Sequence, residues 1–332
     1  MMNIAKQHAT YILAILLAFC LSSWLEAAQD PSQQSTTQPG SSDANASAET
    51  IRVMTFNIRY GTAKDGENAW SHRRKMVFNI LRDHQPDVVG MQEVLEGQRR
   101  ELLSVLPEYK SLGAGRFDGL LRGEFSPIFY RIQRLEILEQ GQFWLSDTPK
   151  VPGSKSWGNG ITRICTWARM RDRETDKSFY FYNTHLDHRS RPSQQRSAEL
   201  IAQRIAARVY QNDPIILTGD FNAAEDTSTI RFIKGEIEKA FEESETPPPS
   251  PKLRDSFRVL HKEATAVGTF NSFRGESSKA KIDYVFVSNE IKVLSAEIIH
   301  DNDEGRYPSD HFPVKATITF SAINKKHISN EH

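Results

Sequence analysis

The segment that most clearly decides the fold is Y-P-S-D-H-F-P-V (Tyr307–Val314), which runs directly into K-A-T-I-T-F (Lys315–Phe320). The second part alternates apolar and polar residues, the pattern of a strand with one buried face. Two prolines hold Asp310 and His311 on a stiff junction between loop and strand, where a scaffold usually presents chemistry. A triad with Ser309 is disfavoured, because adjacent side chains cannot face one another. An ordinary surface turn is the competing interpretation, and this octapeptide alone does not decide.

The composition is that of an ordinary globular protein. The 332 residues are 38% hydrophobic and 25% charged, which is enough apolar content to bury a large core. The 42 Lys and Arg residues balance the 42 Asp and Glu residues, so the formal net charge is zero. This balance argues against a non-specific binder of polyanions, and any surface that binds phosphate must be local.

The N-terminal region predicts export. An apolar run, Tyr11–Cys20, follows Lys6 and precedes a pair of alanines, which is typical of a cleaved signal peptide at residues 1–28 and not of a stable membrane span. Lipid attachment at Cys20 is the alternative, but Phe19 is bulkier than the small residue expected before a lipidated cysteine. We therefore expect a secreted or periplasmic protein.

The remaining chain divides by composition. Residues 29–50 are too polar to pack and are predicted to form a disordered linker, residues 51–320 a single catalytic domain, and residues 321–332 a polar tail. The acidic, proline-rich stretch 242–251 is interpreted as a surface insertion, since strand patterns continue on both sides of it. Cys165 is the only cysteine of the predicted mature chain and is expected to be buried in a strand.

Apolar segments with strand character outnumber helical patterns in the folded part. Helices are predicted near Ser71–His84 and Gln98–Leu106, and the clearest one spans Ser193–Tyr210, with Ser193 as its N-cap and Val209 on its inner face. The strands occur both as helix-linked pairs and as consecutive hairpin-like runs. This mixture indicates an α/β fold in which two packed sheets carry helices on their outer faces.

Polar residues stand at the ends of these apolar strands, where core packing does not require them. They are Asn57 in M-T-F-N, Glu93 in G-M-Q-E, His185 in Y-N-T-H, Asp220 and Asn222 in T-G-D-F-N, Asp283 in K-I-D-Y, and Asp310 and His311 before the last strand. Their repeated placement predicts one convergent cleft. Carboxylates, amides and histidines without cysteine favour a hard divalent cation bound through oxygen, Mg²⁺ or Mn²⁺ before Zn²⁺.

In their order and spacing from Ile51 to Phe320, these motifs resemble the endonuclease/exonuclease/phosphatase superfamily, which has the deoxyribonuclease I-like fold. The segments around N-I-R-Y-G and S-D-H-F-P-V are similar to those of secreted bacterial members near the deadenylase-like exonuclease branch. The resemblance implies a four-layered α/β sandwich, two packed mixed β-sheets flanked by helices. It also implies metal-dependent hydrolysis of phosphoesters.

The resemblance assigns roles on the metal side of the site. It implies that Glu93 is the main metal ligand, with Asn57 beside it, and that Asp310 binds or orients the metal. The implied cofactor is Mg²⁺ or Mn²⁺.

It also assigns roles in the hydrolytic step. Asp220 would position and deprotonate the attacking water, helped by the amide of Asn222. His311 would hydrogen-bond the scissile phosphate or the water, while Asp283 holds its imidazole in one tautomer and orientation. His185 would steady the phosphate or the leaving oxygen.

Two further residues are weaker candidates for contact with the substrate phosphate. Arg163 in T-R-I-C-T-W has the charge for it, and Tyr130 in P-I-F-Y-R has a hydroxyl donor, although strand residues of both types are more often structural. The favoured function is a monomeric, Mg²⁺-dependent phosphodiesterase, an exonuclease-like nuclease whose partner is a phosphoester substrate such as nucleic acid.

Three alternatives stay open. A phosphatase, or a phosphodiesterase of sphingomyelin or inositol lipids, would use the same scaffold with another substrate. A zinc hydrolase of the metallo-β-lactamase type is suggested by H-x-D-H at residues 185–188, but Asn183 stands where that motif needs a leading histidine. A binding module that has lost its chemistry is disfavoured, because all the main catalytic positions are occupied.

Overall fold

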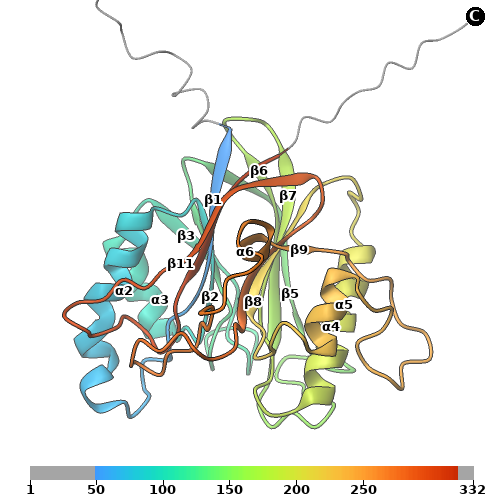
Figure 1. The fold of residues 1–332 in the computed structure, drawn as a ribbon, viewed down its shortest axis with the longest axis horizontal. Coiled ribbons are helices and arrows are strands. Elements are labelled where there is room, and N and C mark those ends of the chain that lie inside the picture. Colours follow the sequence, from blue (N-terminus) through green and yellow to red (C-terminus); the bar gives the residue numbers. More distant parts are fainter. Residues whose placement is uncertain (1–48, 321–332) are drawn as a thin grey trace, which may run out of the picture. The chain divides into compact units, whose positions relative to one another are not determined.

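The computed structural model describes residues 49–320; the predicted signal peptide, most of the linker and the polar tail lie outside them. Among these residues, no helix has the length and apolar character needed to cross a membrane. Two six-stranded sheets form the centre of the fold (Figure 1). In spatial order, the first contains β11 (Ile291–Ile298), β12 (Val314–Phe320), β1 (Thr50–Asn57), β2 (Val88–Gln92), β4 (Ile128–Arg131) and β3 (Tyr109–Leu112).

The second sheet is also mixed. It contains β5 (Leu135–Trp144), β6 (Ile164–Asp172), β7 (Ser178–His185), β8 (Ile215–Asp220), β10 (Asp283–Val287) and β9 (Arg254–Asp255). Within each sheet one central pair is parallel, β1 with β2 and β7 with β8, and the other pairings are antiparallel.

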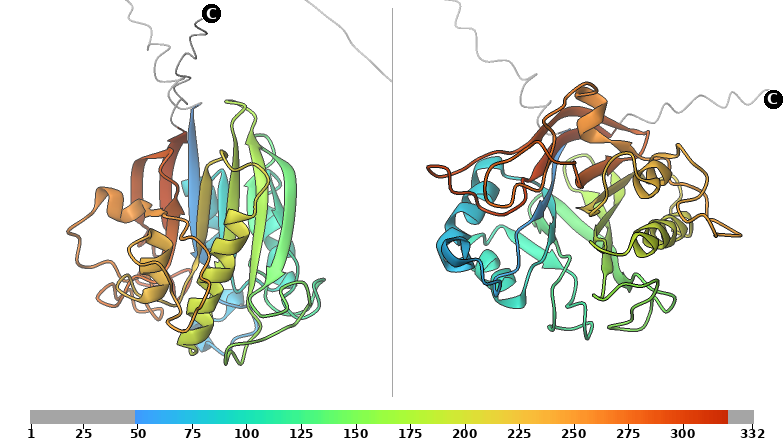
Figure 2. Two further views of the ribbon diagram at one scale, coloured as in Figure 1. Left: turned by 90° about the vertical axis from the view of Figure 1, so that its right-hand side faces the viewer. Right: turned by 60° about the horizontal axis from the view of Figure 1, so that its bottom comes forward.

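Helices cover the outer face of each sheet, so the fold has four layers (Figure 2). Helices α2 (Trp70–His84) and α3 (Glu96–Val105) pack against the first sheet, and α4 (Arg191–Ala206) and α5 (Ser228–Lys234) against the second. Each pair of helices covers one apolar cluster, and a third apolar cluster lies between the sheets and contains side chains of both. The predicted α/β sandwich of two mixed sheets flanked by helices is confirmed.

Two short helical segments complete the described elements. They are η1 (Gly66–Asn68), which precedes α2, and α6 (Ser256–Leu260), which follows β9. The stretch 242–251 forms neither helix nor strand and lies between α5 and β9. Cys165 is fully buried in β6, as predicted.

The helix predictions are correct in place and partly wrong at their ends. The α4 helix begins before Ser193, because Pro192 fits its first turn and the Ser190 hydroxyl caps it by accepting a hydrogen bond from the Ser193 N–H at 3.2 Å. The helix ends at Ala206, so Val209 lies beyond it and is 76% exposed instead of inward.

The strand pairing brings the predicted site residues to one edge. The parallel strands β1 and β2 end together at Asn57 and Gln92, and β7 and β8 end together at His185 and Asp220. The antiparallel strand β10 starts at the same edge, since Asp283 pairs with Asp220. In Figure 2 (right), where this end comes forward, the connecting loops lie between α2 and α3 on one side and α4 and α5 on the other.

The two sheets approach each other closely at Gly90 of β2. A Cβ atom at this position would lie 2.2 Å from the Thr218 Oγ1 and 2.4 Å from the Asn183 Oδ1, both on the second sheet. The φ angle of Gly90 is not in the left-handed region, so the glycine is required for space and not for backbone freedom.

We predict that Gly90→Ala lowers the free energy of unfolding by about 1–3 kcal/mol, because the added methyl group overpacks the space between the sheets. Urea unfolding monitored by circular dichroism measures it. The matched control is Gly97→Ala in α3, where nothing lies within 4 Å of the new Cβ. That change should leave stability unchanged or raise it by up to about 1 kcal/mol. Equal stability of the two variants would contradict the close approach of the sheets.

Candidate active site

All the predicted site residues except Tyr130 converge on one cleft with a volume of about 600 Å³. Seven of them line it: Glu93, Arg163, His185, Asp220, Asn222, Asp310 and His311. Asn57 and Asp283 are fully buried behind the lining and bond to it. The cleft therefore combines residues from the ends of strands in both sheets.

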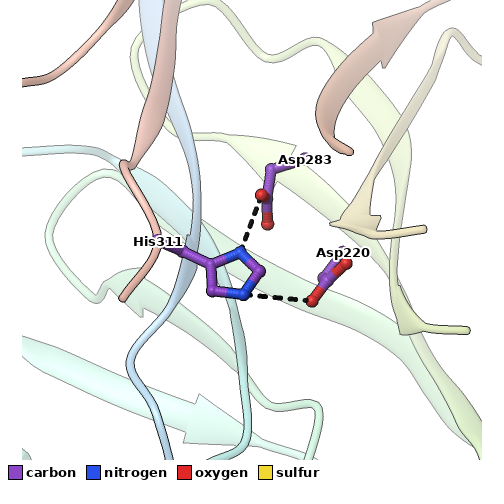
Figure 3. A group of neighbouring side chains, drawn as sticks. All are labelled: Asp220, Asp283 and His311. Atoms are coloured by element: carbon purple, nitrogen blue, oxygen red, sulfur yellow. Dashed lines mark hydrogen bonds and ion pairs between the residues drawn. The ribbon is translucent and has the colours of Figure 1, made fainter. Parts of the chain in front are cut away.

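His311 lies between two aspartates at the centre of the site (Figure 3). Its Nδ1 is 2.9 Å from the Asp283 Oδ2, and its Nε2 is 3.8 Å from the Asp220 Oδ2. The histidine comes from the junction before β12 in the first sheet, whereas the aspartates come from β8 and β10 in the second. The predicted contact between Asp283 and the imidazole is present.

The junction that carries His311 is held from several sides. The Ser309 hydroxyl donates a hydrogen bond to the Asn57 carbonyl at 2.7 Å, and the Phe312 N–H donates to the Thr269 carbonyl at 2.7 Å. The guanidinium of Arg73, 1% exposed, donates to the Pro308 carbonyl at 2.9 Å. These bonds, together with the prolines, explain how the loop keeps the imidazole in place.

The charges around His311 set its protonation state. Burial disfavours its charged form, but the carboxylates of Asp283 and Asp220 outweigh burial and hold the pKa of His311 well above its usual range. Burial, reinforced by the Asp283 carboxylate, raises the pKa of Asp220 to about 7. His311 is therefore a hydrogen-bond donor at neutral pH, and Asp220 has the proton affinity of a general base that works near neutrality.

Asn57 connects the two halves of the site. Its side-chain nitrogen donates to the Asp220 Oδ2 at 2.9 Å and to the Glu93 Oε1 at 3.3 Å, while its oxygen accepts from the Arg59 N–H at 3.0 Å. Sequence reasoning assigned Asn57 as a metal ligand. In this arrangement its amide nitrogen, and not its oxygen, faces the carboxylates.

Glu93 and Asp310 form the more open, carboxylate-rich side of the cleft. The Glu93 Oε2 accepts from the Tyr60 N–H at 3.1 Å and lies 3.9 Å from the Arg59 guanidinium, which is also 3.8 Å from the Asp310 Oδ2. Burial raises the pKa of Asp310. Arg59 was missed as a site residue, although it follows the strand-terminal Asn57 by two positions in N-I-R-Y-G.

The donor set fits a hard divalent cation. Asp220, Asp283 and His311 offer ligand atoms within 4.8 Å of one another. However, Asp283 and His311 already bond to each other, and all three are buried. Glu93 and Asp310 offer carboxylate oxygens on the other side of Asp220, and oxygen ligands of this kind suit Mg²⁺ or Mn²⁺. We therefore favour the Glu93 side as the place for the cation.

Three residues of the site have left-handed backbones. Arg59 has φ 55°, Glu93 φ 60° and Asn222 φ 48°. Each follows the end of a strand. Non-glycine residues rarely adopt this backbone conformation, and it costs of the order of 1 kcal/mol. Such conformations concentrate at functional sites, and the sequence gives no direct signal of them.

His185 is a neutral member of the site. Its Nε2 lies 3.1 Å from the Asn222 side-chain nitrogen and 3.4 Å from the Asp220 Oδ2. An amide nitrogen can only donate, so the Nε2 accepts and no ion pair with Asp220 forms. Burial holds the pKa of His185 well below its usual range, and the positive charge of Arg163 lowers it further. The low pKa agrees with a neutral ring whose Nε2 accepts.

Arg163 lies in the wall of the cleft and is 3% exposed. Its Nη2 is 3.2 Å from the His188 Nδ1 and its Nε is 3.9 Å from the Asp187 Oδ2. Among the described residues the Nε has no hydrogen-bond partner. The Nε is itself buried, so a phosphate contact would have to use the other nitrogens of the guanidinium.

Tyr130 lies elsewhere. It pairs with Val88 at the start of β2, the end opposite the cleft, and belongs to the core between the sheets. The prediction that it contacts the phosphate is therefore wrong. The rival zinc motif also fails, because Asp187 accepts hydrogen bonds from the N–H groups of Arg189 and Ser190 and so stabilises a turn.

Sequence reasoning also missed a rigid ion pair in the cleft wall. Arg116 and Glu124 form two hydrogen bonds of 2.7 Å with each other, and both side chains line the cleft beside Arg163. The two residues lie in the connection between β3 and β4, a loop without a strand-end pattern that would have marked them.

Comparison with known proteins places this site in a family. The model of the Endonuclease/Exonuclease/phosphatase family matches residues 54–311. A solved family protein from Bacteroides thetaiotaomicron is 32% identical, with a TM-score of 0.71 over 82% of this chain and 98% of its own. The mannosyl-6-phosphatase of Bacteroides thetaiotaomicron is 33% identical, with a TM-score of 0.70 over 81% of this chain and 100% of its own.

A more distant relative is Protein angel of Drosophila melanogaster, 25% identical over 178 residues, 50% of this chain. The aligned region spans only 48% of that protein. The matched range of the family model includes Glu93, Asp220, Asp283 and His311, the residues that the two sheets bring together. The chain therefore belongs to the endonuclease/exonuclease/phosphatase family and is a phosphoesterase of that family by descent and by fold.

Proposed function

We propose that this protein is a divalent metal-dependent phosphoesterase whose substrate is a small organic phosphate ester, a sugar phosphate in preference to a long nucleic acid. The observation that carries the proposed chemistry is the placement of His311 between Asp283 and Asp220, opposite the carboxylates of Glu93 and Asp310. A cleft of about 600 Å³ suits a small ligand, and the formal net charge of zero gives no general attraction for a polyanion. The relative that is a mannosyl-6-phosphatase supports the sugar phosphate.

In this proposal the residues divide the work of an in-line hydrolysis. When bound, a divalent cation supplies charge stabilisation at the phosphate oxygens, and Glu93 and Asp310 would hold it. Asp220 accepts a proton from the attacking water while the new P–O bond forms and the bond to the leaving oxygen breaks. The Asn222 N–H, 2.9 Å from the Asp220 Oδ1, keeps that carboxylate oriented.

The cationic groups act on the phosphate. Protonated His311 donates a hydrogen bond to a phosphate oxygen, and Asp283 stabilises the imidazolium and fixes the ring. Arg163, whose side chain lines the cleft, would bind a second oxygen through its guanidinium. His185 donates its remaining ring N–H at the leaving side, because its Nε2 is occupied by Asn222.

We expect Glu93→Gln to raise the Mg²⁺ or Mn²⁺ concentration for half-maximal activity by about tenfold or more, because the near-isosteric amide lacks the carboxylate charge. Activity titrated against each metal measures this, with thermal unfolding in parallel. The matched control is Glu290→Gln, at an exposed glutamate outside the cleft. An unchanged metal response in Glu93→Gln would remove Glu93 from the metal site.

Asp283→Asn should lower single-turnover hydrolysis at least tenfold, and His311→Ala should lower it about 10²–10⁴-fold, because the pair supplies one protonated donor. The double variant should be little slower than His311→Ala alone, as residues acting as a unit lose their effect together. Asp301→Asn is the control, since Asp301 bonds to His84 at 2.8 Å on the surface and should leave turnover unchanged. Multiplicative losses in the double variant would contradict a joint role.

The substrate assignment is tested with purified protein and Mg²⁺ on mannose 6-phosphate, p-nitrophenyl phosphate, inositol phosphates, sphingomyelin, single-stranded RNA and duplex DNA. We expect the highest kcat/KM for the sugar phosphate. Hydrolysis of the monoesters is measured as released inorganic phosphate, and hydrolysis of the diesters as released nucleotides or phosphocholine. A higher kcat/KM for RNA or DNA would contradict the sugar phosphatase and support the nuclease predicted from the sequence. A higher kcat/KM for sphingomyelin would instead support a lipid phosphodiesterase.

A further inference from the structure

A layer of buried polar side chains lies directly beneath the cleft, between the two sheets. It consists of Thr55 and Gln92 from the first sheet and Asn183 and Thr218 from the second, all with 0% exposure. The Gln92 Nε2 donates to the Asn183 Oδ1 at 2.7 Å and to the Thr55 Oγ1 at 3.1 Å. The Thr218 hydroxyl also donates to the Asn183 Oδ1, at 3.2 Å.

Asn183 makes the strongest connection across the interface. Its nitrogen donates to the Met91 carbonyl in β2 at 2.8 Å and to the Pro127 carbonyl, directly before β4, at 3.0 Å. Its oxygen accepts from Gln92, also on the first sheet. The Asn183 side chain of the second sheet is thus hydrogen-bonded to three groups on the side of the first sheet. The missing side chain of Gly90 leaves the space that Asn183 occupies.

The four polar residues have a regular relation to the site. Three of them stand two positions before a site residue on the same strand: Thr55 before Asn57, Asn183 before His185, and Thr218 before Asp220. The fourth, Gln92, is the last residue of β2 and directly precedes Glu93. Side chains two apart on a strand point to the same face. The layer is therefore the support on which the site rests.

Burial energetics alone do not explain this layer. Farther from the cleft the two sheets meet through an apolar cluster, with Val53, Ile128, Met170, Phe181 and Ile216 among its members. A buried hydrogen-bonded set adds little net stability compared with well-packed apolar side chains of the same size. It does require its partners at defined positions, however, whereas apolar surfaces tolerate small shifts.

We propose that Gln92 and Asn183 are positioning residues, whose amide pair sets the first sheet against the second so that Asn57 and Glu93 meet Asp220. The contact that depends on this alignment is the 2.9 Å hydrogen bond from the Asn57 Nδ2 to the Asp220 Oδ2. This inference rests on the proposed phosphoesterase function, because the positioned groups are its base and its metal ligand.

The test replaces the amide pair by apolar residues that are no larger, in the double variant Gln92→Val with Asn183→Ala, because the space beside Gly90 is tight. Removing both amides avoids leaving one of them without the other, although the Thr55 hydroxyl and the Met91 and Pro127 carbonyls each lose a donor. We expect the Tm to stay within roughly 5 °C of the wild type, while kcat falls about 10- to 100-fold and KM changes less than about threefold. The Kd for Mn²⁺, measured by electron paramagnetic resonance without substrate, should rise about tenfold.

A matched control separates positioning from stability. Val53→Ala removes a fully buried side chain from the same interface, outside the polar layer. It should lower the Tm but leave kcat and the Mn²⁺ Kd unchanged. Wild-type kcat and Mn²⁺ affinity in the double amide variant would overturn the inference.

If the double variant does not fold, Thr218→Val decides. It removes the contacts of the hydroxyl with the Asn183 Oδ1 and with the Tyr182 carbonyl of its own sheet, and it keeps the shape of the side chain. A drop in kcat of at least about threefold with an unchanged Tm supports the inference, and unchanged kcat overturns it. The Mn²⁺ measurement is independent of turnover. A wild-type protein inactive on every phosphoester would therefore defeat the proposed function while the affinity comparison still tests positioning.

Discussion

The hydrogen bond between Asn57 and Asp220 is the contact on which the site depends, because it joins the end of a strand in one sheet to the end of a strand in the other. Neither sheet carries the site alone. The first supplies Glu93 and His311, and the second supplies Asp220 and Asp283. The bond between His311 and Asp283 is a second crossing of the same interface. The packing of the two sheets is thus itself part of the active-site geometry.

The electrostatics of the cleft follow from this convergence. Bringing strand ends together concentrates buried carboxylates, and burial opposes their charge, which is why the pKa values of Asp220 and Asp310 are raised. His311 and Arg59 offset part of this negative charge. A divalent cation would relieve the rest, so the demand for a metal is a consequence of the fold and not only of single ligands.

How much could be predicted from the sequence depends on what each feature requires. Polar residues at strand ends are visible in a single sequence, so Glu93, Asp220 and His311 could be placed in one cleft before the structure was known. Their individual roles came from resemblance to a family. Tyr130 failed because its position depends on strand register: β4 runs antiparallel to β2 and carries it to the far end. Periodicity within one segment contains no information on register between segments.

Other features lie beyond sequence patterns for a different reason. The left-handed backbones of Arg59 and Glu93 occur at residue types with no preference for that region, and although asparagine adopts it more readily, Asn222 is one of many asparagines in the chain. Each is held by the surrounding structure, as when the Glu93 carboxylate accepts a hydrogen bond from Tyr60 N–H. Their cost must be offset by packing elsewhere, and the apolar clusters on both faces of each sheet are the available source. Because strained residues keep their conformation only while their surroundings stay in place, loss of the polar contacts between the sheet ends should release the site before it unfolds the protein.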